Sequence, residues 1–157
     1  MTKIGPAVSA PDIAAVHVLF REYAAALPFS LSYQGFEAEL AGLPAPYVPP
    51  DGCLLLARCG ALCLGTVGLK RLGAGAAEIK RLYVVPAARG RGLGRTLLTR
   101  AIDEARARRY VRVRLDSDRR SMAPAIALYR ALGFVEIPPY GPDLDGRIAF
   151  FEKRLQD

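Results

Sequence analysis

A strand, a Gly-rich turn and an amphipathic helix follow one another without a linker between residues 77 and 108. A strand rich in apolar residues extends to Val85, and after Pro86 the apolar residues recur at the spacing of a helix. The turn at residues 89–94 reads Arg-Gly-Arg-Gly-Leu-Gly and lies where the helix begins. Because free N–H groups and the helix dipole favour an anion at a helix N-terminus, this order predicts a phosphate-binding turn.

The composition of this turn favours a pyrophosphate. Glycines let an anion approach the main chain without meeting a Cβ atom, and arginines add positive charge around it. Two common nucleotide motifs do not fit, because a Walker loop ends in Gly-Lys-Ser/Thr and a dinucleotide fingerprint is spaced Gly-x-Gly-x-x-Gly. The spacing here is Gly-x-Gly-x-Gly, and its members are Arg89, Gly90, Arg91, Gly92, Leu93 and Gly94.

The strand before the turn contains an irregularity. Ala77 and Ile79 share one parity, whereas Leu82 and Val84 share the other. Since side chains alternate faces along a regular strand, this change predicts one extra residue, a β-bulge within residues 80–82. The alternative is a strand buried on both faces, where parity carries little information.

The remaining periodicity predicts one mixed α/β domain over residues 1–157, built around a single sheet. A turn at Gly60 separates the two strands of a predicted hairpin. Ser121 is expected to cap the helix that ends at Gly133. The expected helices cover residues 13–27, 36–43, 93–105 and 121–132, and the expected strands cover residues 53–58, 62–69, 77–85, 110–115, 134–137 and 148–153.

Positive charge is concentrated in one part of the chain. The net charge is +7, and residues 70–120 hold fifteen Lys or Arg against five Asp or Glu. Such a block indicates an anionic partner, either nucleic acid or a phosphorylated small molecule. A solvated helix face would account for many of the same arginines, so charge alone does not choose between these interpretations.

No apolar run is long enough to span a membrane, and the N-terminus lacks the regions of a signal peptide. We therefore expect a cytoplasmic protein without a membrane partner. The three cysteines, Cys53, Cys59 and Cys63, match no zinc spacing, and His17 is the one histidine. No metal is expected.

Two segments resemble the signatures of the GNAT superfamily of N-acetyltransferases. Residues 82–86 (Leu-Tyr-Val-Val-Pro) followed by residues 89–94 are similar to its acetyl-CoA motif. Residues 128–134 (Leu-Tyr-Arg-Ala-Leu-Gly-Phe) resemble its second signature, and the element order around both covers nearly the whole chain. The resemblance implies a single N-acetyltransferase domain, with a splayed sheet flanked by helices and acetyl-CoA held where two parallel strands part at a bulge.

The resemblance also implies how acetyl-CoA is held. The backbone of Leu82, Tyr83 and Val84 would pair with the pantetheine arm, and residues 89–94 would hold the pyrophosphate. Relatives often have an asparagine seven residues before the tyrosine of the second signature. Met122 occupies that position here, so the contact is either lost or replaced.

Two proton transfers accompany acetyl transfer to an amine. By resemblance Tyr129 is the general acid that protonates the departing thiolate, although a core tyrosine would show the same helical spacing. Glu78 lies six residues before Val84, which is the spacing of the catalytic glutamate in histone acetyltransferases of this superfamily. Glu78 is thus the first candidate for the general base, Asp116 is the second, and an ordered water is the alternative to both.

The expected function is acetyl-CoA-dependent acetylation of a primary amine, on a small molecule or a protein. Direct attack is favoured because neither motif contains a cysteine that could carry the acetyl group. The acceptor is expected between residues 29–36 and the loop at residues 138–145. The alternative function is a non-catalytic acyl-CoA-binding or regulatory domain; nucleic acid is the less favoured partner, and a homodimer stays open because dimers are common among relatives.

Overall fold

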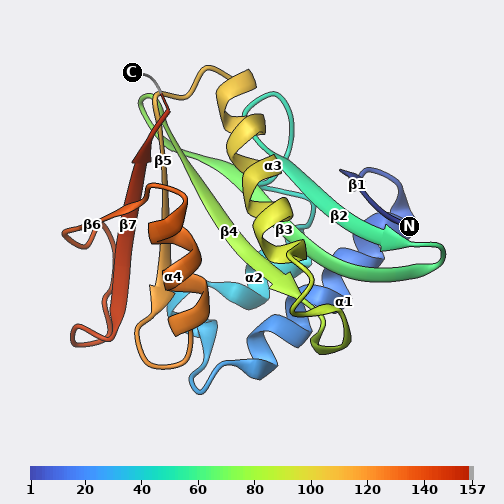
Figure 1. Ribbon diagram of the computed structural model, residues 1–157, viewed down its shortest axis with the longest axis horizontal. Helices are drawn as coiled ribbons and strands as arrows, with labels where there is room; N and C mark the ends of the chain where they lie inside the picture. Colours follow the sequence, from blue (N-terminus) through green and yellow to red (C-terminus); the bar gives the residue numbers. More distant parts are fainter. Residues whose placement is uncertain (156–157) are drawn as a thin grey trace.

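Seven strands pair into one mixed sheet, with the order β1-β2-β3-β4-β5-β7-β6 (Figure 1). The structure is a computed structural model that describes residues 1–155. The strands are β1 (Thr2–Pro6), β2 (Cys53–Cys59), β3 (Leu62–Gly73), β4 (Ala76–Val84), β5 (Arg112–Asp118), β6 (Val135–Ile137) and β7 (Ile148–Arg154). The helices are α1 (Ala10–Ala26), α2 (Phe36–Gly42), α3 (Leu93–Ala107) and α4 (Ala123–Ala131), with short 3-10 turns η1 (Leu31–Gln34) and η2 (Pro86–Ala88). The expected mixed α/β class with one sheet is confirmed.

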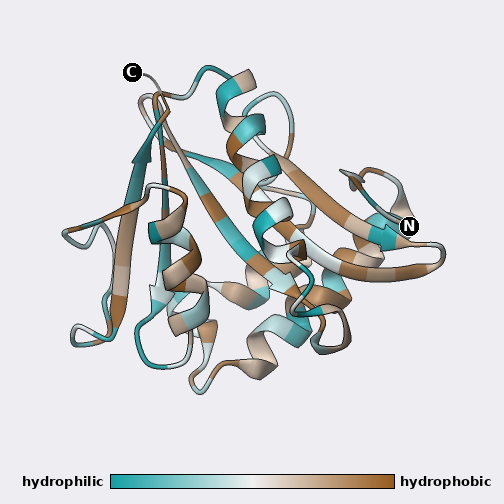
Figure 2. Ribbon diagram, viewed as in Figure 1, coloured by the Kyte–Doolittle hydropathy of each residue, from teal (hydrophilic) through white to brown (hydrophobic). Residues whose placement is uncertain are grey.

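Helices cover both faces of this sheet (Figure 1). On one face α3 and α4 bury Leu97, Leu98 and Tyr129 against the strands. On the other face α1 and α2 bury Phe20 and Leu40. The brown segments of β2 and β3 in Figure 2 lie between these layers, as expected for strands that are covered on both sides.

The sheet opens between β4 and β5, its one parallel pair among the described strands. The two strands pair only where Ala76, Ala77 and Glu78 lie opposite Arg112, Val113 and Arg114. Beyond that point they diverge toward the lower edge of Figure 1. The splayed sheet that the resemblance implied is therefore present.

The predicted bulge in β4 is also confirmed. Thr66 of β3 lies opposite Tyr83 and Gly68 opposite Lys80, so Arg81 and Leu82 face a single β3 residue. Arg81 has φ +62°, a left-handed conformation that is uncommon for a residue with a Cβ atom. After the bulge Leu82 packs on the same face as the earlier apolar residues of the strand, which explains the parity change in the sequence.

Three details of the expected secondary structure were wrong. The edge strand β1 was not expected, because it is short and half-exposed and shows no clear alternation. Ser121 does not cap α4; the helix begins at Ala123, and the Ser121 hydroxyl donates instead to Asp118 Oδ2 over 2.5 Å. The strand expected over residues 110–115 is β5, which begins and ends later, because its polar end at Asp118 was not recognised as part of the ladder with β7.

No helix within residues 1–155 is long and apolar enough to cross a membrane.

Candidate active site

The Gly-rich turn requires glycine at two positions for backbone reasons. Gly90 and Gly92 have φ +80° and +78°, values that residues with a Cβ atom rarely adopt. Helix α3 starts directly after Gly92, which caps it without a side-chain hydrogen bond, and its first turn contains no acidic residue. The N–H groups of that turn are consequently available to an anion.

Arg89 joins this turn to the end of β4. Its Nε donates to the Val84 carbonyl oxygen over 2.9 Å, and its guanidinium lies 5.6 Å from the centre of the Tyr83 ring. The Val84 carbonyl therefore faces a donor from outside the β3–β4 ladder. Arg89, Arg91 and Arg95 are all exposed around the turn, so the region around the α3 N-terminus is strongly positive.

Two cavities follow the opening between β4 and β5, and Tyr23, Leu82 and Met122 line both of them. The outer cavity is bordered by Arg89 and the start of α4. The inner cavity is bordered by Asp116 and Tyr129. Because they share three lining residues, we treat these adjoining cavities as one slot, whose lining extends from Arg89 at the start of the Gly-rich turn to Tyr129.

Tyr129 combines a core position with access to the inner cavity. It is 4% exposed, and its ring packs against Phe134 and Phe151 at centroid distances of 6.0 and 5.8 Å. The Ser117 hydroxyl donates to the Tyr129 oxygen over 3.0 Å. Burial raises the pKa of Tyr129 far above its ordinary value, although the hydrogen bond from Ser117 opposes this. The phenol is therefore protonated at neutral pH and can act as a proton donor.

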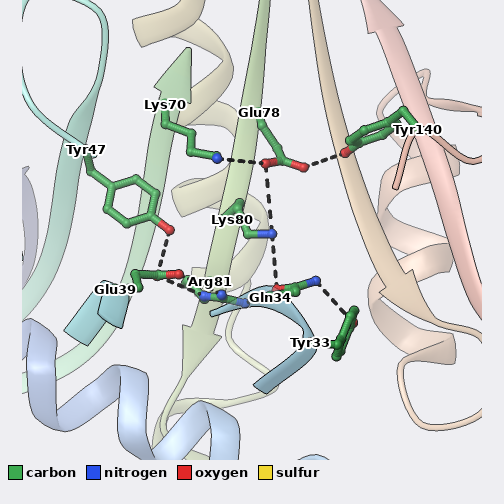
Figure 3. A network of polar contacts seen from close by, with 9 residues as sticks. All are labelled: Tyr33, Gln34, Glu39, Tyr47, Lys70, Glu78, Lys80, Arg81 and Tyr140. Atoms are coloured by element: carbon green, nitrogen blue, oxygen red, sulfur yellow. Dashed lines mark hydrogen bonds and ion pairs between the residues drawn. The ribbon is translucent and has the colours of Figure 1, made fainter. Parts of the chain in front are cut away.

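Glu78 lies on the α1 side of the sheet, within a network of polar contacts (Figure 3). Its Oε2 accepts a 2.6 Å hydrogen bond from the Tyr140 hydroxyl. Its Oε1 lies 3.7 Å from Lys70 Nζ and 3.9 Å from Lys80 Nζ. The Glu78 side chain is only 6% exposed, and both carboxylate oxygens are already in contact with protein groups.

Asp116 is placed differently, on the lining of the inner cavity together with Tyr129. Burial raises the pKa of Asp116; the charge of Glu78 raises it further, whereas Lys80 and Arg81 lower it. Within residues 1–155 its carboxylate takes part in no hydrogen bond or ion pair of the kind that Glu78 makes. An unpaired carboxylate with a raised pKa beside the slot has the properties of a general base.

Residues 16–134 match the family model of the acetyltransferase (GNAT) family. The chain belongs to the GNAT family. It is 35% identical over 131 residues to an uncharacterized N-acetyltransferase of Schizosaccharomyces pombe, covering 82% of this chain and 80% of the relative. As a GNAT-family member the protein is an acetyltransferase, which confirms the enzyme class expected from the two signatures.

Solved GNAT structures share the fold of this acetyltransferase. A GNAT-family acetyltransferase from Staphylococcus aureus superposes with a TM-score of 0.79 at 20% identity, over 99% of this chain and 100% of the other. An acetyltransferase from Salmonella typhimurium, solved with its cofactor acetyl-CoA, has a TM-score of 0.74 at 24% identity, over 99% and 95% of the two chains. At these identities the likeness shows the fold.

The bulge adds residues to this GNAT site that were not anticipated from the sequence. Lys80 and Arg81 are consecutive, yet both side chains lie on the α1 face and donate to Gln34 Oε1, over 3.2 and 2.8 Å (Figure 3). Gln34 in turn donates to the Tyr33 hydroxyl over 3.1 Å. The parity change was the available signal, because a bulge places two successive side chains on one face.

The loop between β6 and β7, part of which was expected to border the acceptor, is anchored by Arg147. Arg147 Nε and Nη2 lie 2.7 and 3.0 Å from the two Asp118 carboxylate oxygens. The Arg147 guanidinium also lies 5.0 Å from the centre of the Phe29 ring. The loop is thereby attached to both β5 and the segment between α1 and η1. Within residues 1–155, no group of three or more His, Cys, Asp or Glu side chains is placed to hold a metal ion.

Proposed function

We propose that this acetyltransferase moves the acetyl group of acetyl-CoA to a primary amine by direct attack. The slot carries this proposal, since its lining runs from Arg89, three residues before the uncapped helix N-terminus at Gly92, to the buried Tyr129 side chain. A ligand with a pyrophosphate at one end and a reactive thioester at the other matches these two ends. The acetyl-CoA bound to the Salmonella relative supports the same cosubstrate.

Acetyl-CoA would be held by groups in the slot and at the helix N-terminus beside it. The N–H groups of Gly92, Leu93 and Gly94 and the side chains of Arg89 and Arg91 would hold the pyrophosphate. The backbone of Leu82, Tyr83 and Val84 would pair with the pantetheine arm. Met122 lines both cavities, and so an apolar thioether would stand where relatives often place an amide.

The reaction needs a neutral amine and a proton for the leaving group. The amine nitrogen forms a bond to the thioester carbon, the carbon–sulfur bond breaks, and its electron pair goes to sulfur. Tyr129 gives its proton to that thiolate, while a base takes the surplus proton from nitrogen. CoA-SH and the acetylated amine then leave. The protonated base gives its proton to solvent and the Tyr129 phenolate takes one up from solvent, so both groups return to their starting states.

Two carboxylates are candidates for the base, and they would act differently. Glu78 would act through the Tyr140 hydroxyl that donates to it. Asp116 would take the proton directly or through one water, because its carboxylate faces the slot unpaired. The Tyr140→Phe variant separates the two routes, since it removes the link from Glu78 and leaves Asp116 unaltered.

The test is CoA release from acetyl-CoA in the presence of a panel of primary amines. We expect Tyr129→Phe to lower kcat about 10²- to 10⁴-fold, the usual contribution of a general acid, with little change in the KM for acetyl-CoA. The base is identified by whichever of Asp116→Asn and Glu78→Gln lowers kcat at neutral pH as much as Tyr129→Phe does. Binding of acetyl-CoA without amine-dependent CoA release for any member of the panel would instead indicate the non-catalytic alternative.

The expected location and assembly also stay proposals. We propose a cytoplasmic enzyme whose residues 1–157 form one N-acetyltransferase domain, with a homodimer as its assembly. Cell fractionation tests the location, and light scattering at several protein concentrations tests the assembly. A separate nucleic-acid site would be indicated by two observations together. DNA binding would weaken steeply with salt, and free CoA would not compete with it.

A further inference from the structure

Ser117 is a polar residue in an apolar row of β5. Val113 and Leu115 precede it at alternating positions, and both are buried against the α3 and α4 face of the sheet. Ser117 continues this row and is 2% exposed. Alternation would place an apolar side chain there. A buried hydroxyl at such a position needs a hydrogen-bond partner, because its desolvation is unfavourable otherwise.

That partner is Tyr129. The Ser117 hydroxyl donates to the Tyr129 oxygen over 3.0 Å, in a contact that is buried on both sides. Because the tyrosine oxygen accepts here, its own O–H stays free to donate elsewhere. Within residues 1–155 the Tyr129 hydroxyl donates to no other group, while Tyr129 lines the inner cavity of the slot.

The backbone under Ser117 is held firmly. Ser117 pairs with Ala149 in the β5–β7 ladder, and Asp118 next to it is bound by Arg147. The Tyr129 ring is fixed from the other side by Phe134 and Phe151. The donor and the acceptor of this hydrogen bond thus belong to two elements, β5 and α4, that pack rigidly around the end of the slot.

We propose that Ser117 is a positioning residue for proton transfer by Tyr129, an inference that rests on the proposed acid role of that tyrosine. Its hydrogen bond directs the phenolic proton toward the slot. When that proton passes to the thiolate sulfur, the Ser117 donor stabilises the phenolate that is left behind. A hydrogen bond to a charged oxygen is stronger than one to a neutral oxygen, so the contact strengthens as the proton leaves.

The test is a double-mutant cycle on kcat. We expect Ser117→Ala to lower kcat about 10- to 100-fold, the range for a hydrogen bond to a charged group, with an unchanged KM for acetyl-CoA. Ser117→Thr keeps the donor and should recover most of the activity. In the Tyr129→Phe background Ser117→Ala should cause no further loss, because no phenolate forms there.

Thr66→Val is the matched control. Thr66 is also a fully buried hydroxyl in the same sheet, but it donates to the Leu55 carbonyl oxygen. We expect this variant to lose stability and keep kcat. An equal loss from Ser117→Ala with and without the Tyr129 hydroxyl, or no loss in either background, would overturn the inference. Full activity of Tyr129→Phe alone would instead refute the proposed acid.

Discussion

The guanidinium of Arg81 binds both carboxylate oxygens of Glu39, with Nη2–Oε1 and Nε–Oε2 distances of 2.8 and 3.1 Å (Figure 3). Arg81 lies in the β4 bulge and Glu39 lies in α2. This pair therefore connects the opening of the sheet to the face that α1 and α2 cover. Arg81 is 4% exposed, and its charge also lies 5.2 Å from the centre of the Phe36 ring. The bulge is therefore supported by tertiary contacts.

Removal of Glu39 should destabilise the protein strongly. Glu39→Ala leaves the Arg81 charge buried without its partner, and we expect the free energy of unfolding to fall by about 3–5 kcal/mol. The double variant Arg81→Met/Glu39→Leu, which removes both charges, should be closer to the wild type than Glu39→Ala. Urea unfolding measures all three proteins. A Glu39→Ala variant as stable as the wild type would show that the pair does not support the bulge.

Two glycines of the turn should respond in opposite ways to alanine. Gly92 has φ +78°, so Gly92→Ala should cost about 1–2 kcal/mol of stability. Gly94 lies within α3, and an added Cβ would meet Val84 Cγ2 at an ordinary 3.9 Å. Gly94→Ala should therefore raise stability by up to about 1 kcal/mol.

Both glycine variants should nevertheless bind CoA more weakly, if the pyrophosphate lies against the first turn of α3. Calorimetric titration with CoA, beside thermal unfolding, separates stability from binding. Gly94→Ala is the informative variant, because it should be more stable and yet weaker in CoA binding. Unchanged CoA affinity in Gly94→Ala would place the pyrophosphate away from this helix end.

Asp116→Asn should increase stability and decrease activity. The pKa of Asp116 is raised above its ordinary value of 3.8, chiefly by burial. A raised pKa in the folded state means that the ionised carboxylate destabilises the fold at neutral pH, and that protonation removes this penalty. We therefore expect Asp116→Asn to unfold at a higher temperature than the wild type at pH 7, and this difference to vanish below pH 3.8.

If Asp116 is the base, the activity of the wild type should depend on the ionisation of this carboxylate. Since only the ionised form accepts a proton, kcat/KM should decline as the pH falls through the raised pKa of Asp116. A pH–rate profile measures this acidic limb. An Asp116→Asn variant with full activity and the same profile would assign the limb to another group, with Glu78→Gln as the next variant to measure.

Asp118 should behave in the opposite sense. Hydrogen bonds from Arg147 hold the pKa of Asp118 well below its ordinary value of 3.8. A carboxylate with a lowered pKa stabilises the folded state at pH values above its ordinary pKa. This contribution is lost as the pH falls toward the pKa in the folded state. At pH 7 Asp118→Asn should lose about 1.5–3 kcal/mol, the range for hydrogen bonds to a charged group. Urea unfolding should show a smaller difference at pH 3 than at pH 7.

Local sequence determined the segment that we propose holds the cofactor. The strand, the turn at residues 89–94 and helix α3 were predicted from apolar periodicity and from glycines that a phosphate-binding turn requires, and the structure confirms all three elements. The bulge was also predictable, because side-chain alternation in a strand has a fixed period and a shift of one residue is visible in the apolar pattern. These features depend on neighbours in the chain.

Only the tertiary structure decided which side chains meet at the proposed acceptor end. Tyr140 and Glu78 are 62 residues apart, Arg81 and Glu39 are 42 apart, and Ser117 and Tyr129 come from different elements. Such contacts depend on strand order and on which face each side chain takes, and neither is encoded at a local spacing. The family could thus be identified from two short motifs, whereas the network at the proposed acceptor site follows from the way β4, β5 and the flanking helices pack.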